Sequence, residues 1–369
     1  MSTGKPGEEK LDIIGVAVDG NPDKLVSMLL NQAGIAGHSY AFYKTPDMVE
    51  CFDGAGVIIL GINSQNNDKE AALIKRAKEA GAYVVVVEDI HCAHARLPES
   101  CRQYVDLLVA ADSFSAKQAS KIGYEIGIVP GPPPHWMADV EMCRNRHYSP
   151  EIWVGSERIT NADILVWYGG GKNPEENNQI LKYIGNSIRM FENPNFVLAM
   201  TRHPGESQWA IENGMSMKAT VDRQSIYEQL RSGGVRFVDT SNLGTRDIFA
   251  RVDVPIMASA STMTIGLTYA RRPSIFLYSE SVRQELLRLG NSSETWYLAD
   301  FGCMVSAEMG DEGSLQRAIR GVVEHPEPMI QKMEACFPTP AGFDTAQHWW
   351  EKISERLEDI ATLERECSV

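Results

Sequence analysis

The sequence contains no long hydrophobic segment, no closely paired cysteines and no excess of positive charge. None of its apolar runs approaches the roughly 20 residues that a membrane-spanning helix needs. Its net charge of −14 argues against sequence-independent binding to nucleic acid or to an anionic membrane. The seven cysteines never occur with CxxC spacing, so we predict neither a zinc cluster nor a disulfide framework and expect buried, inert thiols.

Several signals of other protein classes are also missing. Residues 1–10 are polar and lack the apolar stretch of a signal peptide. The GxxxxGK(S/T) spacing of a Walker loop does not occur. No GxGxxG follows the first expected strand, which disfavours a dinucleotide dehydrogenase. We therefore expect a soluble, cytoplasmic protein with no nucleic-acid partner, no transmembrane segment, no cofactor and no metal, and the sequence leaves the oligomeric state open.

Short apolar runs alternate with helical patterns along the first part of the chain. The runs are continuous and rich in β-branched residues, which indicates strands covered on both faces. Their alternation with helices predicts right-handed βαβ units and a parallel sheet. The expected strands are residues 13–18, 56–62, 83–87, 106–111 and 126–129, and the expected helices are residues 22–32, 69–80 and 115–122.

A proline-rich stretch, residues 130–134, separates this series from a second one, because consecutive prolines continue neither a helix nor a central strand. The second series predicts another parallel sheet. Its expected strands are residues 164–168, 196–200, 235–238, 254–258, 274–278 and 304–306, and its expected helices are residues 177–190, 225–231 and 281–289.

These patterns predict an α/β protein of two doubly wound, Rossmann-like parallel-sheet domains. The expected divisions are residues 1–135, a linker at 136–160, a second domain at 161–335, and a C-terminal segment at 336–369. Residues 345–365 form an amphipathic helix pattern. We expect Trp349 and Trp350 to pin this helix against the first domain.

Two strand-to-helix turns in the second domain have the composition of a phosphate site. One follows residues 164–168 and consists of Gly169, Gly170, Gly171 and Lys172. The other follows residues 254–258 and contains Ser259, Ser261, Thr262 and Thr264. Glycines let a backbone approach an anion, and a helix N-terminus supplies N–H donors and partial positive charge. The alternative readings are a turn that needs positive φ and ordinary N-capping by Ser and Thr.

Other polar residues follow expected strands or the prolines. Arg202 and His203 follow residues 196–200, at the strand end where open α/β sheets bind ligands. A loop after residues 83–87 combines carboxylates with histidine, as proton abstraction requires; its HxxH spacing also permits a metal site. His135 and Trp136 follow the prolines and are candidates for the wall of an inter-domain cleft or for interface core. The candidates in the loop are Glu88, Asp89, His91 and His94.

Three stretches resemble the GT-B glycosyltransferase fold, which nucleotide-sugar epimerases and hydrolases share. Residues 106–131 are similar to the end of a GT-B N-terminal domain. Residues 164–172 with 201–204 are similar to the first half of the nucleotide-binding domain, and residues 250–275 are similar to its donor-binding segment. The resemblance implies two domains facing a cleft, with an acceptor domain at 1–135 and a nucleotide-sugar-binding domain at 161–335.

The resemblance also implies roles for the candidates. The two turns with Arg202 and His203 would hold a nucleoside diphosphate without a metal, and His91, Glu88 or Asp89 would supply the base. Many members carry a ribose-binding carboxylate about four residues past the Ser–Thr pair. This sequence has none at that position, and Glu280 is a candidate replacement.

The expected function is therefore transfer of a sugar from a nucleoside-diphosphate donor to the hydroxyl of a small-molecule or glycan acceptor. Nucleotide-sugar hydrolysis or epimerisation on the same fold is one alternative. A non-catalytic binding protein that retains the fold is another, and the missing carboxylate favours it.

Overall fold

The structure is a computed structural model that describes residues 12–18, 20–49, 52, 55–62, 67–90, 92–128, 134, 137, 140–141, 151–193, 195–212, 214, 218–288, 295–339 and 344–367. The chain divides into two compact units. Unit 1 comprises Met1–Met137 and Thr339–Val369, and unit 2 comprises Ala138–Pro338. Hence the two ends of the chain belong to the same unit.

Unit 1 is built on a parallel six-stranded sheet of order β2-β1-β3-β4-β5-β6. Runs such as Tyr83–Val87 form its strands because β-branched side chains pack well on both faces of a buried sheet. The strands are β1 (Asp12–Val16), β2 (Ser39–Tyr43), β3 (Ala55–Gly61), β4 (Tyr83–Val87), β5 (Leu107–Ala110) and β6 (Ile126–Ile128).

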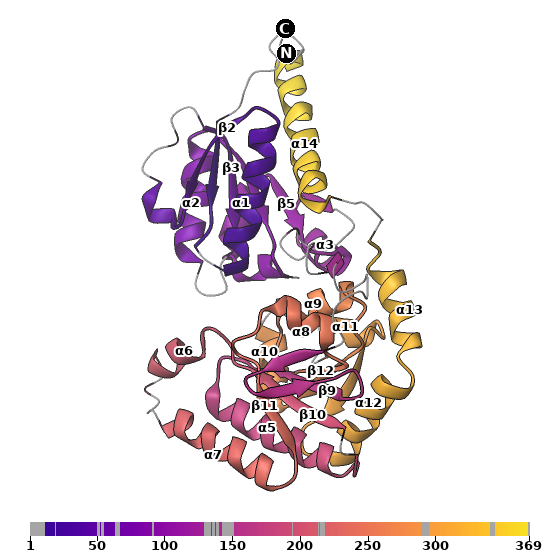
Figure 1. Ribbon diagram of the computed structural model, residues 1–369. Coiled ribbons are helices and arrows are strands. Elements are labelled where there is room, and N and C mark those ends of the chain that lie inside the picture. The colour runs from indigo at the N-terminus through magenta and orange to yellow at the C-terminus, as the bar shows by residue number, and fades with distance from the viewer. Residues whose placement is uncertain are drawn as a thin grey trace. The chain divides into compact units, whose positions relative to one another are not determined.

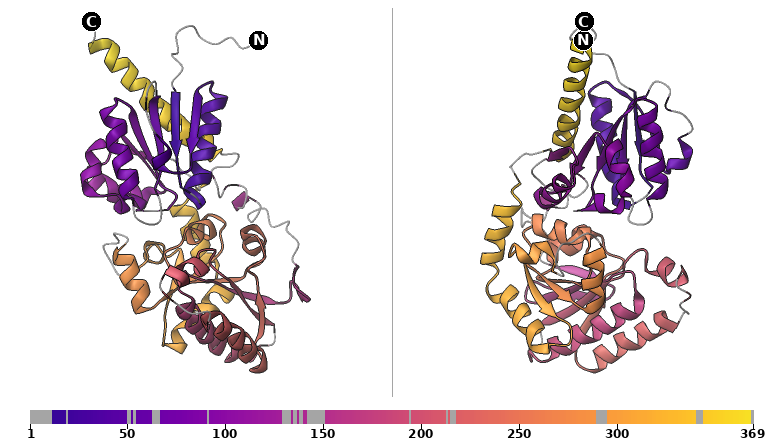
Figure 2. Two further views of the ribbon diagram at one scale, coloured as in Figure 1. Left: turned by 90° about the vertical axis from the view of Figure 1, so that its left-hand side faces the viewer. Right: turned by 180° about the vertical axis from the view of Figure 1, so that it is seen from behind.

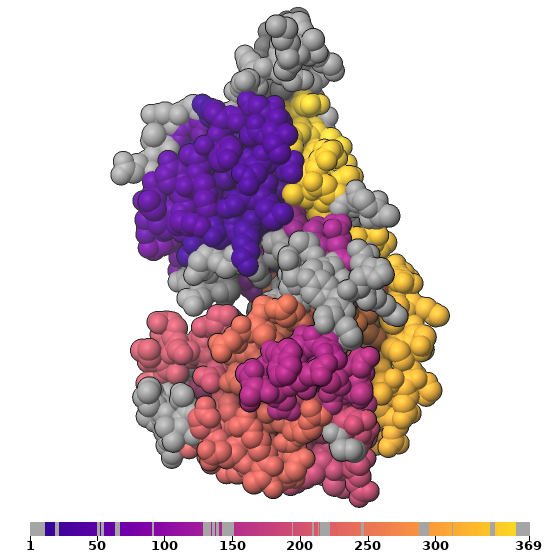
Figure 3. Space-filling view, viewed as in Figure 1, coloured from indigo at the N-terminus to yellow at the C-terminus, as the bar shows by residue number. Residues whose placement is uncertain are grey.

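The helices of unit 1 are α1 (Gly20–Ile35), α2 (Asp68–Glu79), α3 (Ser113–Lys121) and α14 (Thr345–Cys367), with short 3-10 turns η1 (Pro46–Met48), η2 (Ala93–Arg96) and η3 (Glu99–Tyr104). Helix α14 lies beside α1 (Figure 1) and extends along unit 1 in the views of Figure 2. Trp349, Trp350 and Ile353 of α14 are buried in one core with Leu25 and Leu29 of α1. The space-filling view shows the same α14 surface bordering the N-terminal part of unit 1 (Figure 3).

Unit 2 contains a second parallel sheet, of order β11-β10-β9-β12-β13-β14. Its strands are β9 (Ile164–Gly169), β10 (Phe196–Thr201), β11 (Arg236–Asp239), β12 (Val254–Met257), β13 (Ser274–Tyr278) and β14 (Met304–Glu308). When the six strands of this sheet are numbered in chain order, their order in the sheet is 3-2-1-4-5-6, which is a doubly wound order. The chain leaves β9 toward one side of the sheet and β12 toward the other, so the topological switch point lies between these two strands.

The helices of unit 2 follow its strands in chain order, as expected for βαβ units. They are α5 (Pro174–Arg189), α6 (Glu206–Glu212), α7 (Lys218–Ser232), α8 (Thr245–Arg251), α9 (Thr262–Tyr269), α10 (Glu280–Arg288), α11 (Tyr297–Asp300), α12 (Glu312–Glu324) and α13 (Glu327–Cys336). The prediction of two Rossmann-like α/β domains is therefore confirmed by two parallel sheets.

The sequence-based prediction omitted three short strands that are at most partly buried over most of their length. Strand β2 is an edge strand whose first three residues are exposed, so it lacks the buried run that identified its neighbours. The antiparallel hairpin of β7 (Ile152–Val154) and β8 (Glu157–Ile159) lies in the expected linker 136–160. It turns at Gly155, which has a φ of 62°. Arg236 of β11 forms an ion pair with Glu157, which ties the hairpin to the sheet of unit 2.

Candidate functional site

The two predicted turns of unit 2 lie side by side at the switch point. Strands β9 and β12 are hydrogen-bonded neighbours, and their carboxyl ends reach the same edge of the sheet. A Cβ placed on Gly171, after β9, would lie 4.0 Å from the Cβ of Ser259, after β12. Because ligands of open α/β sheets bind at this position, we take this edge as the candidate site.

The glycines of the first turn are required by lack of space and not by backbone conformation. None of the three has a positive φ. A Cβ on Gly169 would lie 2.8 Å from both the Met257 sulfur and the Trp167 ring. A Cβ on Gly170 would lie 3.1 Å from the carbonyl oxygen of Thr201. By contrast, a Cβ on Gly171 would make only ordinary contacts, the nearest at 3.8 Å.

The N–H groups of this turn already have acceptors within the protein. Gly170 donates to the Thr201 carbonyl oxygen at 3.0 Å, and Gly171 donates to Oδ1 of Asn177 at 2.8 Å. Helix α5 is likewise capped by its own sequence, since Oδ1 of Asn173 accepts from the N–H groups of Glu175 and Glu176. Pro174 has no N–H to offer. The N–H groups of Gly170 and Gly171 are therefore engaged within the protein.

The second turn caps helix α9. Oγ of Ser261 accepts from the N–H of Met263 at 3.2 Å. The hydroxyl of the buried Thr264 donates to the Ser261 carbonyl oxygen at 2.6 Å. Ser259, Ser261 and Thr262 are partly exposed. N-capping by Ser261 and ligand contact at this edge are compatible, because the helix dipole still places partial positive charge there.

Lys172 and His203 border the same small space. A Cβ on Gly205 would lie 3.3 Å from Nδ1 of His203 and 3.8 Å from Cε of Lys172. The N–H of Gly205 donates to His203 Nδ1 at 2.9 Å, so the proton of the neutral ring is on Nε2. Burial and the charge of Lys172 lower the pKa of His203. Within the described residues Lys172 forms no ion pair, so its positive charge is uncompensated.

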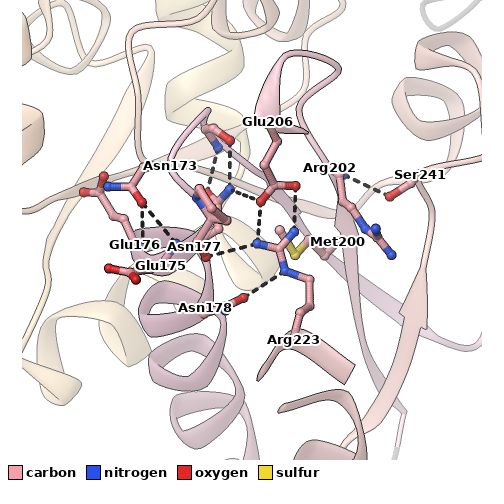
Figure 4. Close-up of polar contacts among 12 residues, drawn as sticks. Asn173, Glu175, Glu176, Asn177, Asn178, Met200, Arg202, Glu206, Arg223 and Ser241 are labelled. Atoms are coloured by element: carbon pink, nitrogen blue, oxygen red, sulfur yellow. Dashed lines mark hydrogen bonds and ion pairs between the residues drawn. The ribbon is translucent and has the colours of Figure 1, made fainter. Parts of the chain in front are cut away.

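Arg202 is oriented away from this pair. Its guanidinium donates to Oδ2 of Asp239 at 3.0 Å, and its N–H donates to Oγ of Ser241 at 3.0 Å. Figure 4 shows the Arg202 side chain pointing away from Asn177 and Glu206. Although burial opposes it, hydrogen bonding by Ser241 and Arg202 lowers the pKa of Asp239. The Arg202 guanidinium is thus engaged by Asp239, whereas His203 borders the same space as Lys172.

A buried polar cluster lies under this edge, and the sequence reasoning missed it (Figure 4). Arg223 of α7 is 3% exposed and forms an ion pair with Glu206, the first residue of α6. Asn177 is 1% exposed, accepts from the Gly171 N–H and donates to the Gly171 carbonyl oxygen and to Glu206. Arg223 also donates to Asn178 at 2.8 Å. The adjacent pair Asn177 and Asn178, Glu206 and Arg223 come from three different helices, so no local sequence pattern signalled the cluster.

Two carboxylates lie near the end of β13. Glu280, the predicted replacement for a ribose-binding carboxylate, is exposed and accepts from Gln284 at 2.9 Å. Glu176 of α5 accepts from the hydroxyls of Ser279 and Ser281, which links α5 to the loop after β13. In this structure the Glu176 carboxylate therefore serves the contact between α5 and this loop.

In unit 1, Glu88 is enclosed at the end of β4. It is 0% exposed. Its Oε1 accepts from the N–H of His94 at 2.8 Å and contacts Nδ1 of His94 at 2.7 Å. Its Oε2 accepts from the N–H of Ala111 at 3.2 Å and from the hydroxyl of Ser115. These contacts fill the acceptor positions of the carboxylate, so in this structure Glu88 joins two loops and helix α3.

Asp89, the next residue, has a different environment. It is 7% exposed, and its Oδ1 has no hydrogen-bond partner within the described part of the chain. Burial raises the pKa of Asp89 to about 6, although Arg96 opposes the change. Nearby Cys92 has a φ of 55°, an uncommon conformation that occurs often in functional loops. The remaining predicted residues of unit 1, His91, His135 and Trp136, lie outside the described residues.

No group of three or more His, Cys, Asp or Glu side chains among the described residues is arranged to hold a metal ion. Within the same ranges, no helix has both the length and the apolar character that crossing a bilayer requires.

Comparisons with known proteins show the fold. No protein-family model matches the chain. No curated protein matches its sequence. Among solved structures, a UDP-GlcNAc 2-epimerase from Neisseria meningitidis bound to UDP-GlcNAc aligns with a TM-score of 0.59 and 12% identity, over 95% of this chain and 100% of that chain. MurG from Acinetobacter baumannii aligns with a TM-score of 0.58 and 9% identity, over 94% and 100%.

A third structure, a putative UDP-N-acetylglucosamine 2-epimerase from Listeria monocytogenes, aligns with a TM-score of 0.56 and 10% identity, over 95% and 98%. These alignments cover nearly the whole chain and include glycosyltransferase and epimerase structures. They confirm the expected GT-B architecture. At such low identity they show the fold alone.

Proposed function

We propose that unit 2 binds the diphosphate of a nucleoside-diphosphate sugar and that the chain is a glycosyltransferase that moves the sugar to an acceptor hydroxyl. The observation that carries the proposal is the proximity of Lys172 and His203 to the same small space at the carboxyl edge of the sheet. Both residues lie at the sheet edge that also presents the N-terminus of α9. An anionic group is the ligand that such a set of cationic and partly positive groups recognises.

The proposed site stabilises a leaving diphosphate without a metal. Lys172 contributes a mobile point charge, His203 contributes an Nε2–H donor, and α9 contributes its dipole. Groups that are held in place before charge develops on the leaving group need little rearrangement during the reaction. The glycine turn would then contribute space for the ligand, while its N–H groups stay bonded to Thr201 and Asn177.

The choice of a nucleotide sugar draws on two structural neighbours. The structure from Neisseria meningitidis contains UDP-GlcNAc, and a further neighbour, MnaA from S. aureus, contains UDP. The second of these aligns with a TM-score of 0.53 and 11% identity, over 96% of this chain and 98% of that chain. These ligands belong to those proteins, and they direct the first choice of test compounds for this one.

We assign the base that deprotonates the acceptor hydroxyl to the loop after β4. Among the described residues, Asp89 is the candidate that we favour. A base must accept a proton near the working pH. Because burial raises the pKa of Asp89 to about 6, its carboxyl group is largely deprotonated at neutral pH and still basic enough to accept a proton. His91, the other candidate in this loop, remains a prediction from the sequence.

The test is calorimetric titration with UDP, GDP, CDP, ADP and TDP, first without metal and then with magnesium. We expect saturable binding of one diphosphate. Lys172→Ala should weaken its binding about tenfold, or roughly 1.4 kcal/mol, because the uncompensated charge is lost. The matched control is Lys182→Ala, an exposed lysine on α5, which should bind like the wild type. Absence of binding, or equal affinity in the two variants, would reject the site.

Epimerisation or hydrolysis of the nucleotide sugar is a second candidate function. Asp89 favours it because a carboxyl group with a pKa of about 6 can both remove and return a proton near neutral pH. Incubating the protein with the selected nucleotide sugar and no acceptor separates the candidates. A new epimer or free sugar would indicate this alternative, whereas an unchanged donor that turns over only with added acceptor would indicate transfer.

A further inference from the structure

We infer that Glu206 and Arg223 are positioning residues that fix the distance between Lys172 and His203 and thereby set the affinity for the diphosphate. This inference rests on the proposed function of the same edge. Glu206 directly follows Gly205 and its charge acts on His203, and Arg223 is paired with the Glu206 carboxylate. Their buried ion pair (Figure 4) joins the segment that carries Lys172 to the segment that carries His203.

The segment with His203 is attached to this ion pair directly. Glu206 begins α6 three positions after His203, and its N–H donates to the His203 carbonyl oxygen at 3.0 Å. Only the short turn that contains Gly205 separates the two residues. A displacement of the Glu206 carboxylate would therefore move the His203 backbone as well.

The segment with Lys172 is attached through Asn177. The side-chain amide of Asn177 forms two hydrogen bonds with Gly171, each 2.8 Å long, and a third to Oε1 of Glu206 at 3.1 Å. Gly171 immediately precedes Lys172. A continuous set of hydrogen bonds therefore connects the Lys172 segment to the His203 segment, with Glu206 at its centre.

Arg223 holds Glu206 in place from the other side. Its guanidinium donates to both carboxylate oxygens of Glu206, to Oδ1 of Asn178 and to the carbonyl oxygen of Pro174. A planar fork with several N–H donors meets all these acceptors together, and a lysine ammonium cannot reproduce that geometry. A buried ion pair contributes little net stability because desolvation offsets its attraction. The pair instead fixes the arrangement of helices α5, α6 and α7.

Unit 2 contains a matched residue with no connection to the candidate edge. Arg251 is 6% exposed and forms an ion pair with Asp253 at 2.6 Å. It also donates to the carbonyl oxygens of Thr160 and Asp163. These partners precede strands β9 and β12, so Arg251 lies at the amino edge of the sheet, opposite the candidate site. Arg251 thus resembles Arg223 in burial and bonding but differs in location.

The experiment compares Arg223→Lys with Arg251→Lys in the full-length protein. Thermal unfolding and calorimetric titration are measured for each, with the diphosphate that the wild type selects. We expect both variants to unfold at lower temperature, because each loses hydrogen bonds of a buried guanidinium. Only Arg223→Lys should also weaken diphosphate binding, by about tenfold, since misplacement of binding groups by a fraction of an ångström is costly. Arg251→Lys should stay within about twofold of the wild type.

Unchanged affinity in Arg223→Lys, or equal loss in the two variants, would overturn the positioning role while leaving the proposed function intact. A wild type that binds no diphosphate would overturn both.

If Arg223→Lys does not fold, Glu206→Gln takes its place, because the amide keeps the shape and the contact with Asn177. The charge of Glu206 raises the pKa of His203. Glu206→Gln should therefore lower the His203 titration midpoint in NMR and weaken binding, and normal binding would overturn the inference.

Discussion

Asp89 and Glu88 are adjacent in sequence and carry the same functional group, yet their surroundings give them different properties. Glu88 accepts hydrogen bonds on both oxygens, whereas Oδ1 of Asp89 is buried with no partner among the described residues. At Asp89, desolvation outweighs the charge of Arg96 and the backbone hydrogen bonds of Asp89 and Ile90, so the neutral carboxyl group is favoured. A buried group left in this state costs stability, which is common for residues kept for function.

Replacing Asp89 by Asn should change how the stability of the protein depends on pH. Because the folded pKa of about 6 lies above the ordinary 3.8, the native state binds the proton more tightly than the unfolded state does. The free energy of unfolding should therefore fall as pH rises from about 4 to about 6. Asn has no charge to desolvate. The variant should be more stable than the wild type by ~3 kcal/mol at pH 7.5, and most of this gain should be lost near pH 4.

Urea unfolding at pH 4 and at pH 7.5 measures this difference. Glu79→Gln serves as the control, because Glu79 is an exposed residue at the end of α2 and its replacement should leave the stability close to that of the wild type at both pH values. An Asp89→Asn protein that is less stable than the wild type at pH 7.5 would show that its carboxylate is well solvated or paired.

At this scale the sequence predicted the types of residue but not their environments. Proximity to a strand end correctly placed Lys172 and His203 at one edge, and the same rule applied to Arg202. It did not predict that Asp239 would hold the Arg202 guanidinium, because Asp239 belongs to a different strand. Partners that are brought together only by tertiary structure leave no local signal in the sequence.

Among the elements, the turn after β9 shows why identical residues are not equivalent. Gly169 is enclosed by Met257 and Trp167, and Gly170 faces the Thr201 carbonyl oxygen. Gly171 has ordinary space around its Cα and no positive φ. Three glycines in succession therefore serve two purposes, since the first two permit close packing and the third borders the candidate site.

This difference gives a prediction for the turn. Gly169→Ala should destabilise the protein by about 1–3 kcal/mol, because an added methyl group forces its neighbours to move. Gly171→Ala should leave stability unchanged or raise it by roughly 0.5 kcal/mol through reduced unfolded-state entropy. If the backbone at Gly171 approaches a diphosphate, that variant should still bind more weakly than the wild type.

Chemical unfolding and calorimetric titration of both variants provide the measurement. Gly81→Ala is a steric control with open space, although its φ of 86° adds strain. Normal diphosphate affinity in Gly171→Ala would mean that the ligand does not contact this part of the turn, and a stable Gly169→Ala would contradict the packing argument.

The elements that could be predicted from sequence are those whose apolar runs are buried. Strands β4 and β13 begin and end at the predicted residues, because Tyr83–Val87 and Ser274–Tyr278 are continuous β-branched or aromatic runs. Strand β2 and the β7–β8 hairpin were not predicted. Their residues are largely exposed, so neither hydrophobic periodicity nor length distinguishes them from loops.

At the scale of the whole molecule, each unit has its own sheet and core. The core of unit 1 includes Trp349 and Ile353 of α14 together with residues of α1 and the first sheet. The candidate diphosphate site is built entirely from residues of unit 2. Stability of one unit and ligand binding by the other should therefore respond to different substitutions.

Trp349→Ala tests this separation. Removing a fully buried indole should cost unit 1 about 3–5 kcal/mol and lower its unfolding temperature, while the diphosphate affinity stays within about twofold of the wild type. Saturating diphosphate should raise the unfolding temperature of unit 2 by mass action. Differential scanning calorimetry with and without ligand measures both effects. Loss of binding as large as in Lys172→Ala would show that the two units are energetically coupled.

The overall architecture was accessible from sequence because alternation of strand and helix patterns is a property of long segments and tolerates errors at individual boundaries. The strand order of each sheet was not accessible from sequence, since it depends on which connections cross over another strand. The order of unit 2 places β9 next to β12 and so creates the switch point. The position of the candidate site is therefore a consequence of topology that the sequence only suggested.

The contribution of α14 to unit 1 has a consequence for synthesis on the ribosome. The sheet of unit 1 is translated first, but Trp349, Trp350 and Ile353 emerge only after all of unit 2. At typical elongation rates this interval lasts roughly 10 to 40 seconds. During that time the apolar face of α1 that α14 later covers is open to solvent, so the nascent chain offers a binding surface to chaperones that the finished protein no longer has.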